Sequence, residues 1–148
     1  MAIGIPAAQL AALRKGMAAK PRKPIDTAAV DLLAFHVKAQ RLPTPDREYR
    51  FAAMAVGGTG AGVKERLRKA RLRDWRFDFA WPDQMVALEM DGGGFVGGRH
   101  STGPGIEKDC EKYSNAAAMG WRLLRVTPRQ VKSGQAVDWI GKALEIRS

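Results

Sequence analysis

Apolar and polar residues alternate most clearly in the stretch RFDFAWPDQMVALEMD, residues 76–91, in two runs that flank a Pro-Asp pair. Successive side chains of a strand point to opposite faces, so this pattern predicts a β-hairpin with one apolar and one polar face. Three acids, Asp78, Glu89 and Asp91, fall at polar positions. With a tight turn at the Pro-Asp pair, Asp78 is expected nearly opposite Ala87 and diagonal to Glu89, and the three carboxylates converge on one side of the hairpin.

Apolar residues recur at helical spacing in three other segments, residues 26–43, 106–119 and 128–148. The first begins with a capping Asp-Thr pair and stops at a proline, and the second ends at Gly120. The side chains expected to face inward are Val30, Leu33, Ala34, Val37, Ile106, Cys110, Tyr113, Ala117, Val137, Ile140 and Leu144.

Residues 47–51 and 121–127, REYRF and WRLLRVT, resemble short strands. Combined with the hairpin and the helices, they predict an α/β fold with a central mixed β-sheet of about four strands flanked by helices. Residues 25–148 would form this domain. The Ala-rich, basic residues 1–24 are expected to be a flexible arm with at most a short helix at residues 8–17.

Composition narrows the class of protein. The chain of 148 residues fits one domain, and no apolar run approaches the roughly 20 residues of a membrane span. A single cysteine excludes an intrachain disulfide and a Cys-rich zinc cluster. No secretory signal peptide is evident, so we expect no membrane partner and a cytoplasmic location, or the host cytoplasm if the chain is phage-encoded.

The net charge of +10 is concentrated in two places. Residues 1–23 carry five Lys or Arg and no acid, and residues 64–76, here called the basic segment, carry seven against two acids. Two basic patches on an otherwise balanced chain indicate a polyanionic partner, most simply DNA. The alternative is a solubilising tail and a solvated helix face. The predicted DNA contacts are Lys64, Arg66, Arg68, Lys69, Arg71 and Arg73.

The acidic face of the hairpin suggests a metal site. Carboxylates at such short distances repel each other and raise each other's pKa values unless a cation neutralises them. A hard divalent ion with oxygen ligands is the simplest such cation. The glycines after Asp91 would let a phosphate or another backbone approach closely. The alternative is an amphipathic hairpin whose acids only face solvent.

The sequences DFAWPDQMVALEMDGG and EKDCEKYSNAAAMGWRLLRVT together resemble the PD-(D/E)XK nuclease superfamily. The likeness is closest to the branch of very-short-patch repair endonucleases and small phage or bacterial relatives. In that branch an Asp on one strand precedes an E-x-D-G element on the next, followed by a histidine loop, a D-x-x-K/R helix and G-W-x-x-L-R. The match covers about residues 74–128 and implies a restriction-endonuclease-like, Mg²⁺- or Mn²⁺-dependent DNA endonuclease.

Carried over to this chain, the resemblance makes Asp78 and Glu89 metal ligands. The family name implies a lysine at position 91, where this chain has Asp91. Asp91 would then be a further ligand or the general base. His100 could act as base, or as acid for the leaving oxygen, because its unperturbed pKa is near 6.5. Lys112 could supply the missing positive charge.

Several alternatives stay open. Lys108, on the same helix face, could replace Lys112 in that role, or both lysines could simply pair with neighbouring acids. Asp31 loosely matches an acid on the first helix of some relatives, whereas His36 and Cys110 are interpreted as structural. Two rival functions remain: a DNA-binding module on the same fold that has lost catalysis, and an interaction protein with an acidic patch. Whether the chain forms a homodimer is left open.

Overall fold

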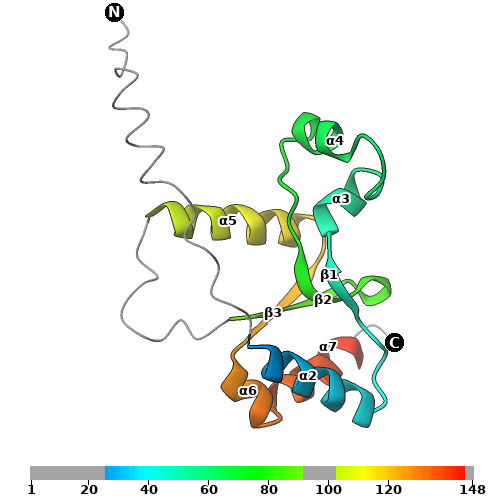
Figure 1. Ribbon diagram of the computed structural model, residues 1–148, viewed down its shortest axis with the longest axis vertical. Helices are drawn as coiled ribbons and strands as arrows, with labels where there is room; N and C mark the ends of the chain where they lie inside the picture. Colours follow the sequence, from blue (N-terminus) through cyan, green and yellow to red (C-terminus); the bar gives the residue numbers. More distant parts are fainter. Residues whose placement is uncertain (1–25, 92–102, 146–148) are drawn as a thin grey trace, which may run out of the picture.

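The computed structural model describes residues 26–91 and 103–145 (Figure 1). The predicted arm at residues 1–24 and the glycine-rich loop that contains His100 lie outside these residues. In chain order the elements are α2 (Thr27–Ala39), β1 (Asp46–Tyr49), α3 (Phe51–Ala55), α4 (Val63–Lys69), β2 (Phe77–Trp81), the 3₁₀ turn η1 (Pro82–Gln84), β3 (Val86–Met90), α5 (Gly103–Ala118), β4 (Arg122–Val126), α6 (Pro128–Lys132) and α7 (Gln135–Glu145).

The four strands form one sheet in the order β1-β2-β3-β4. The β1–β2 and β2–β3 pairs are antiparallel, and β3 and β4 are parallel because α5 carries the chain back across the sheet. This is the α/β fold with a four-stranded mixed sheet and flanking helices that the sequence predicts. No helix within the described residues is long and apolar enough to cross a membrane.

Helices cover both faces of the sheet, as Figure 1 shows. On one face α2, α6 and α7 pack over Phe79, Trp81, Leu88 and Val126. On the other face α3, α4 and α5 pack over a second buried cluster that includes Phe77, Ala80 and Ala87. Ala116 of α5 belongs to this second cluster.

Most of the predicted helix faces are confirmed. Asp26 caps α2 by accepting a hydrogen bond from the Ala29 amide at 3.2 Å, and the predicted apolar residues of α2 and α7 are buried or half-buried. The C-terminal segment is two helices rather than one. Gly134 separates them with a φ of 81°, which is in the left-handed region that glycine adopts without strain.

The predicted inner stripe of α5 is wrong. Ile106, Cys110 and Ala117 are exposed and Tyr113 is half-buried, whereas Lys112 and Ala116 are the buried residues of the helix. A pattern based on apolarity assigns a lysine to the solvent side. Here Lys112 faces the sheet because a carboxylate on β3 neutralises it.

The strand predicted at residues 47–51 is also partly wrong. The strand ends at Tyr49, and Phe51 begins α3 and stacks on Phe77 with ring centroids 4.1 Å apart. A helix of five residues is too short to show a helical period in the sequence, so α3 was not predicted.

Candidate active site at the acidic hairpin

The hairpin turn is longer than predicted and changes which residues face each other. Pro82–Gln84 form a 3₁₀ turn, and Met85 follows in the left-handed region with a φ of 54°. The register pairs Phe79 with Leu88 and Ala80 with Ala87. Asp78 is therefore level with Glu89 and not with Ala87, which corrects the arrangement predicted from a two-residue turn.

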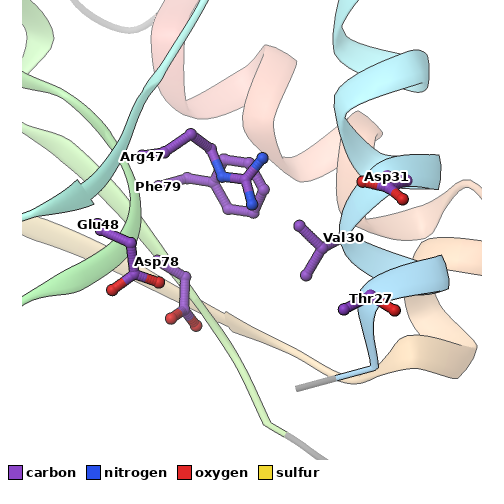
Figure 2. Close-up of a pocket in the computed structure, with 7 residues that line it drawn as sticks. All are labelled: Thr27, Val30, Asp31, Arg47, Glu48, Asp78 and Phe79. Carbon is purple, nitrogen blue, oxygen red and sulfur yellow. The ribbon is translucent and has the colours of Figure 1, made fainter. Parts of the chain in front are cut away.

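Asp78 lies between the sheet and α2. Its Oδ2 accepts a hydrogen bond from the Met90 amide at 2.7 Å, which fixes the carboxylate against the end of β3. Its Oδ1 has no hydrogen-bond partner among the described residues. The side chain lines a cavity of about 150 Å³, here called the Asp78 cavity, whose walls come from β1, β2 and α2 (Figure 2). Its lining residues are Thr27, Val30, Asp31, Arg47, Glu48, Asp78 and Phe79.

A distortion of β1 accompanies this placement of Asp78. Glu48 is level with Asp78 in the register and has a φ of 50°, in the left-handed region that is unusual for a residue with a side chain. As a result Arg47 packs over Phe79 on the α2 side of the sheet, while Tyr49 contacts Trp121 on the α5 side. Simple alternation would place both residues on one face.

The neighbouring strand shows the same change of face. Phe77 belongs to the cluster under α5, and Phe79 belongs to the cluster under α2, although they are two residues apart. Asp78 lies between them, at the point where the sheet changes face, and opens toward α2. Alternation along an ideal strand had placed Asp78 on the same face as Glu89.

Glu89 faces α5, where both of its oxygens are bonded. Lys112 Nζ donates to Oε1, and the Tyr113 hydroxyl donates to Oε2 at 3.1 Å. The side chains of Lys112 and Glu89 are only 8% and 14% exposed, so this is a largely buried ion pair. Burial, together with the negative charge of Glu89, raises the pKa of Tyr113, so its hydroxyl stays protonated and remains a donor.

Asp91 pairs with Arg125 of β4, at distances of 3.1 and 3.0 Å from Arg125 Nη2 to its two oxygens. The Arg125 guanidinium also lies 4.6 Å from the centre of the Tyr113 ring. A continuous set of contacts thus connects Lys112, Glu89, Tyr113, Arg125 and Asp91. These contacts join α5 to the parallel strands β3 and β4.

The three predicted metal ligands therefore occupy three different environments instead of one open face. Within residues 26–91 and 103–145, no three Asp, Glu, His or Cys side chains form a group that could hold a metal ion. The structure brings Lys112 to Glu89, a partner that the sequence did not predict, and it places Asp31 on the wall of the Asp78 cavity. Cys110, interpreted as a core residue, is exposed.

The donor chemistry still suits a hard cation. Mg²⁺ usually keeps several waters and takes only one or two protein carboxylates. Asp78 offers an oxygen that no described residue uses, beside Glu48 and inside a cavity with space for water. Glu89 and Asp91 could contribute only by sharing oxygens that Lys112, Tyr113 and Arg125 now use.

The predicted DNA contacts of the basic segment fall into two groups. Arg66 has a structural role, because its guanidinium donates hydrogen bonds to the carbonyls of Val56, Ala61 and Gly58 at 2.8, 2.7 and 2.9 Å. Arg68 pairs with Glu65, and Arg73 pairs with Glu111 of α5. The remaining residues are exposed and form no ion pair within the described part of the chain; they are Lys64, Lys69 and Arg71.

Reasoning from the sequence missed four residues of this region: Arg47, Glu48, Tyr113 as a partner of Glu89, and Arg125. The only signal for Arg125 was its place in the predicted strand at residues 121–127, which the structure pairs in parallel with β3, the strand that ends just before Asp91. No feature of the sequence predicts the left-handed conformation of Glu48.

Comparisons of the chain with family models, with curated proteins and with solved structures give no match. The assignment of a function therefore depends on the geometry and on the motif resemblance.

Proposed function

We propose that the chain is a metal-dependent DNA endonuclease that hydrolyses phosphodiester bonds. The observation that supports this most is the position of Asp78. Its carboxylate has one oxygen without a partner among the described residues, faces a charged cavity and is level with Glu89 on the next strand. The PD-(D/E)XK resemblance implies that this pair of residues is the metal-binding pair.

Mg²⁺ or Mn²⁺, when bound, would polarise the scissile phosphate and lower the pKa of a bound water. Asp78 would hold the ion through its second oxygen, and Glu89 and Asp91, which the resemblance adds, would join it only by sharing the oxygens that Lys112, Tyr113 and Arg125 now use. Lys112 would keep Glu89 ionised and oriented through their ion pair, and Tyr113 would fix the second Glu89 oxygen. His100, outside the described residues, stays a candidate for the general base.

The exposed lysines and arginines of the basic segment would contact the DNA backbone. Such contacts contribute affinity without reading sequence. They lie on α4 and on the connection from α4 to β2, and Arg73 joins this connection to α5. The same β2 strand then carries Asp78, so the chain links the proposed backbone contacts directly to the proposed catalytic acid.

A second candidate is a DNA-binding module that has lost catalysis. One observation favours it: Glu89 and Asp91 already have cationic partners, Lys112 and Arg125, so neither needs a metal ion for charge balance. Such a protein would bind DNA through the basic segment and leave it intact.

The two candidates are separated by incubating the protein with duplex, nicked, mismatched and four-way-junction DNA, with Mn²⁺ or with EDTA. An endonuclease cuts at least one substrate only with the metal, and Asp78→Asn abolishes this cleavage. Asp83→Asn is the matched control, because Asp83 is an exposed acid in the turn of the same hairpin. Salt-sensitive binding without Mn²⁺-dependent cleavage of any substrate would instead support the non-catalytic module.

A further inference from the structure

Arg47 is the only cationic residue among the described residues that line the Asp78 cavity. It pairs with Phe79 across the β1–β2 register, and its guanidinium carbon lies 4.6 Å from the centre of the Phe79 ring. A guanidinium stacked on an aromatic face is held by a cation–π contact that leaves its N–H groups free at the edges. Figure 2 shows the group across the ring and directed toward Val30 of α2.

The guanidinium of Arg47 has no acceptor in the described part of the chain. It forms neither an ion pair nor a hydrogen bond there, although three carboxylates line the same cavity. Other arginines nearby behave differently: Arg50 makes two hydrogen bonds to Asp74, and Arg66 makes three to backbone carbonyls. Arg47 is therefore a positioned cation whose five N–H donors have no acceptor among the described residues.

We propose that Arg47 binds a DNA phosphate beside Asp78 and supplies the positive charge that the PD-(D/E)XK lysine would supply at position 91. This inference rests on the proposed nuclease function and names a residue that the family resemblance does not assign. A planar guanidinium matches two phosphate oxygens in a bidentate geometry. Lys112 suits this role less well, because it is buried and already neutralised by Glu89.

The charge balance of the cavity supports the proposal. Among the described lining residues there are three carboxylates, those of Asp31, Glu48 and Asp78, and one cation, Arg47, which leaves two negative charges in excess. That excess would repel a phosphate. One divalent cation cancels it, so the cavity becomes neutral only when both the metal ion and Arg47 are present. Removing Arg47 would leave a net negative charge beside the phosphate even in the presence of metal.

The first test measures binding and does not depend on cleavage. The affinity of a fluorescent duplex is measured at several salt concentrations in Ca²⁺, whose longer bonds to oxygen polarise a phosphate less than those of Mg²⁺. Arg47→Gln should reduce the magnitude of the log–log salt slope by about 0.9, the value of one phosphate contact, whereas Arg47→Lys should keep it. Arg41→Gln is the control, because Arg41 is exposed but does not line the cavity.

The second test measures single-turnover cleavage in Mn²⁺. Arg47→Gln should lower the rate by roughly 10²-fold at saturating DNA, the scale of losing one donor to a developing charge. Arg47→Lys keeps the positive charge but not the planar, bidentate geometry of the guanidinium, so it should recover only part of that loss. Thermal unfolding of both variants checks that β1 is intact.

The outcomes distinguish the two proposals. If the wild-type protein binds DNA but cuts nothing, the endonuclease proposal fails, and the salt slope alone decides whether Arg47 contacts a phosphate. A wild-type slope in Arg47→Gln, or an equal loss in Arg41→Gln, overturns the Arg47 inference even if cleavage occurs. A wild-type protein that does not bind DNA overturns both.

Discussion

The buried ion pair between Lys112 and Glu89 gives the sharpest prediction about stability. Lys112→Met keeps the length and the apolar stem of the side chain but removes its charge. Glu89, only 14% exposed, would then retain the Tyr113 hydroxyl as its single polar partner. Removing one member of a buried pair typically costs 3–5 kcal/mol, because an uncompensated charge stays buried. Glu89 lies one residue from the end of β3 and keeps its bond to Tyr113, so we expect a loss at the lower end of this range, about 3 kcal/mol.

The magnitude is measured by urea unfolding with linear extrapolation. Glu89→Gln should cost a similar amount, since it leaves the Lys112 ammonium unpaired. The double variant, Lys112→Met with Glu89→Gln, should recover most of the loss, because an apolar replacement of a buried pair is often neutral. With about 3 kcal/mol lost in each single variant and only about 1 kcal/mol in the double variant, the coupling energy from this double-mutant cycle should be about 5 kcal/mol in magnitude.

Lys108→Met provides the matched control, one helical turn earlier on α5. Lys108 is exposed, so its replacement should change the free energy of unfolding by no more than about 0.5 kcal/mol. Additive single-mutant effects below about 1 kcal/mol each would refute the reasoning, because they would mean that the pair is solvated in solution.

Three further predictions concern single contacts. Tyr113→Phe should cost about 1–2 kcal/mol in urea unfolding. Because the pKa of Tyr113 is raised on folding, its contribution to stability should be complete below about pH 10 and should be lost as the pH rises further. Arg66→Gln should loosen the loop at residues 57–62, which proteolysis detects, and Arg66→Lys should not restore the three carbonyl contacts, whereas Lys69→Gln should leave the loop intact. Replacing by Gln the three cations of the basic segment that form no ion pair within the described residues should reduce the DNA salt slope by about 2.7, and an unchanged slope would mean a merely solvated face. These cations are Lys64, Lys69 and Arg71.

The fold was largely predictable because its signals are local. The period of two in the hairpin, the capping Asp26 before a helical period and the glycine that ends α5 each act within a few residues. Four strands and their flanking helices follow from these signals. The mixed sheet follows from the helix that joins β3 to β4.

The details of the site were less predictable because they depend on contacts that are distant in the sequence. Lys112 is buried only because Glu89, 23 residues away, neutralises it. Arg125 reaches Asp91 from 34 residues away. A hydrophobicity pattern cannot show either pairing, and it assigned the inner face of α5 to Ile106 and Cys110 instead.

The conformation of Glu48 accounts for the largest difference at the site. One residue in the left-handed region reverses the alternation of side chains along β1. The alternation along β2 is reversed at the paired position, between Phe77 and Phe79. Strict alternation therefore predicted a single acidic face, whereas Asp78 opens toward α2 and Glu89 faces α5. Local distortions of this kind cost energy and often lie at functional sites.

Because Asp78 and Glu89 face different sides of the sheet, we predict that one of them affects mainly metal binding and the other mainly stability. Asp78 uses one oxygen to accept the Met90 amide, a contact that an asparagine carbonyl can also make. Asp78→Asn should therefore leave the free energy of unfolding nearly unchanged and weaken Mn²⁺ binding, measured by calorimetry. Glu89→Gln should be markedly less stable even without metal, because it leaves Lys112 unpaired. For that reason Asp78→Asn tests the metal site more cleanly than Glu89→Gln does. If both variants are equally stable, Lys112 does not depend on Glu89, and Glu89 is then as free to bind a metal ion as Asp78.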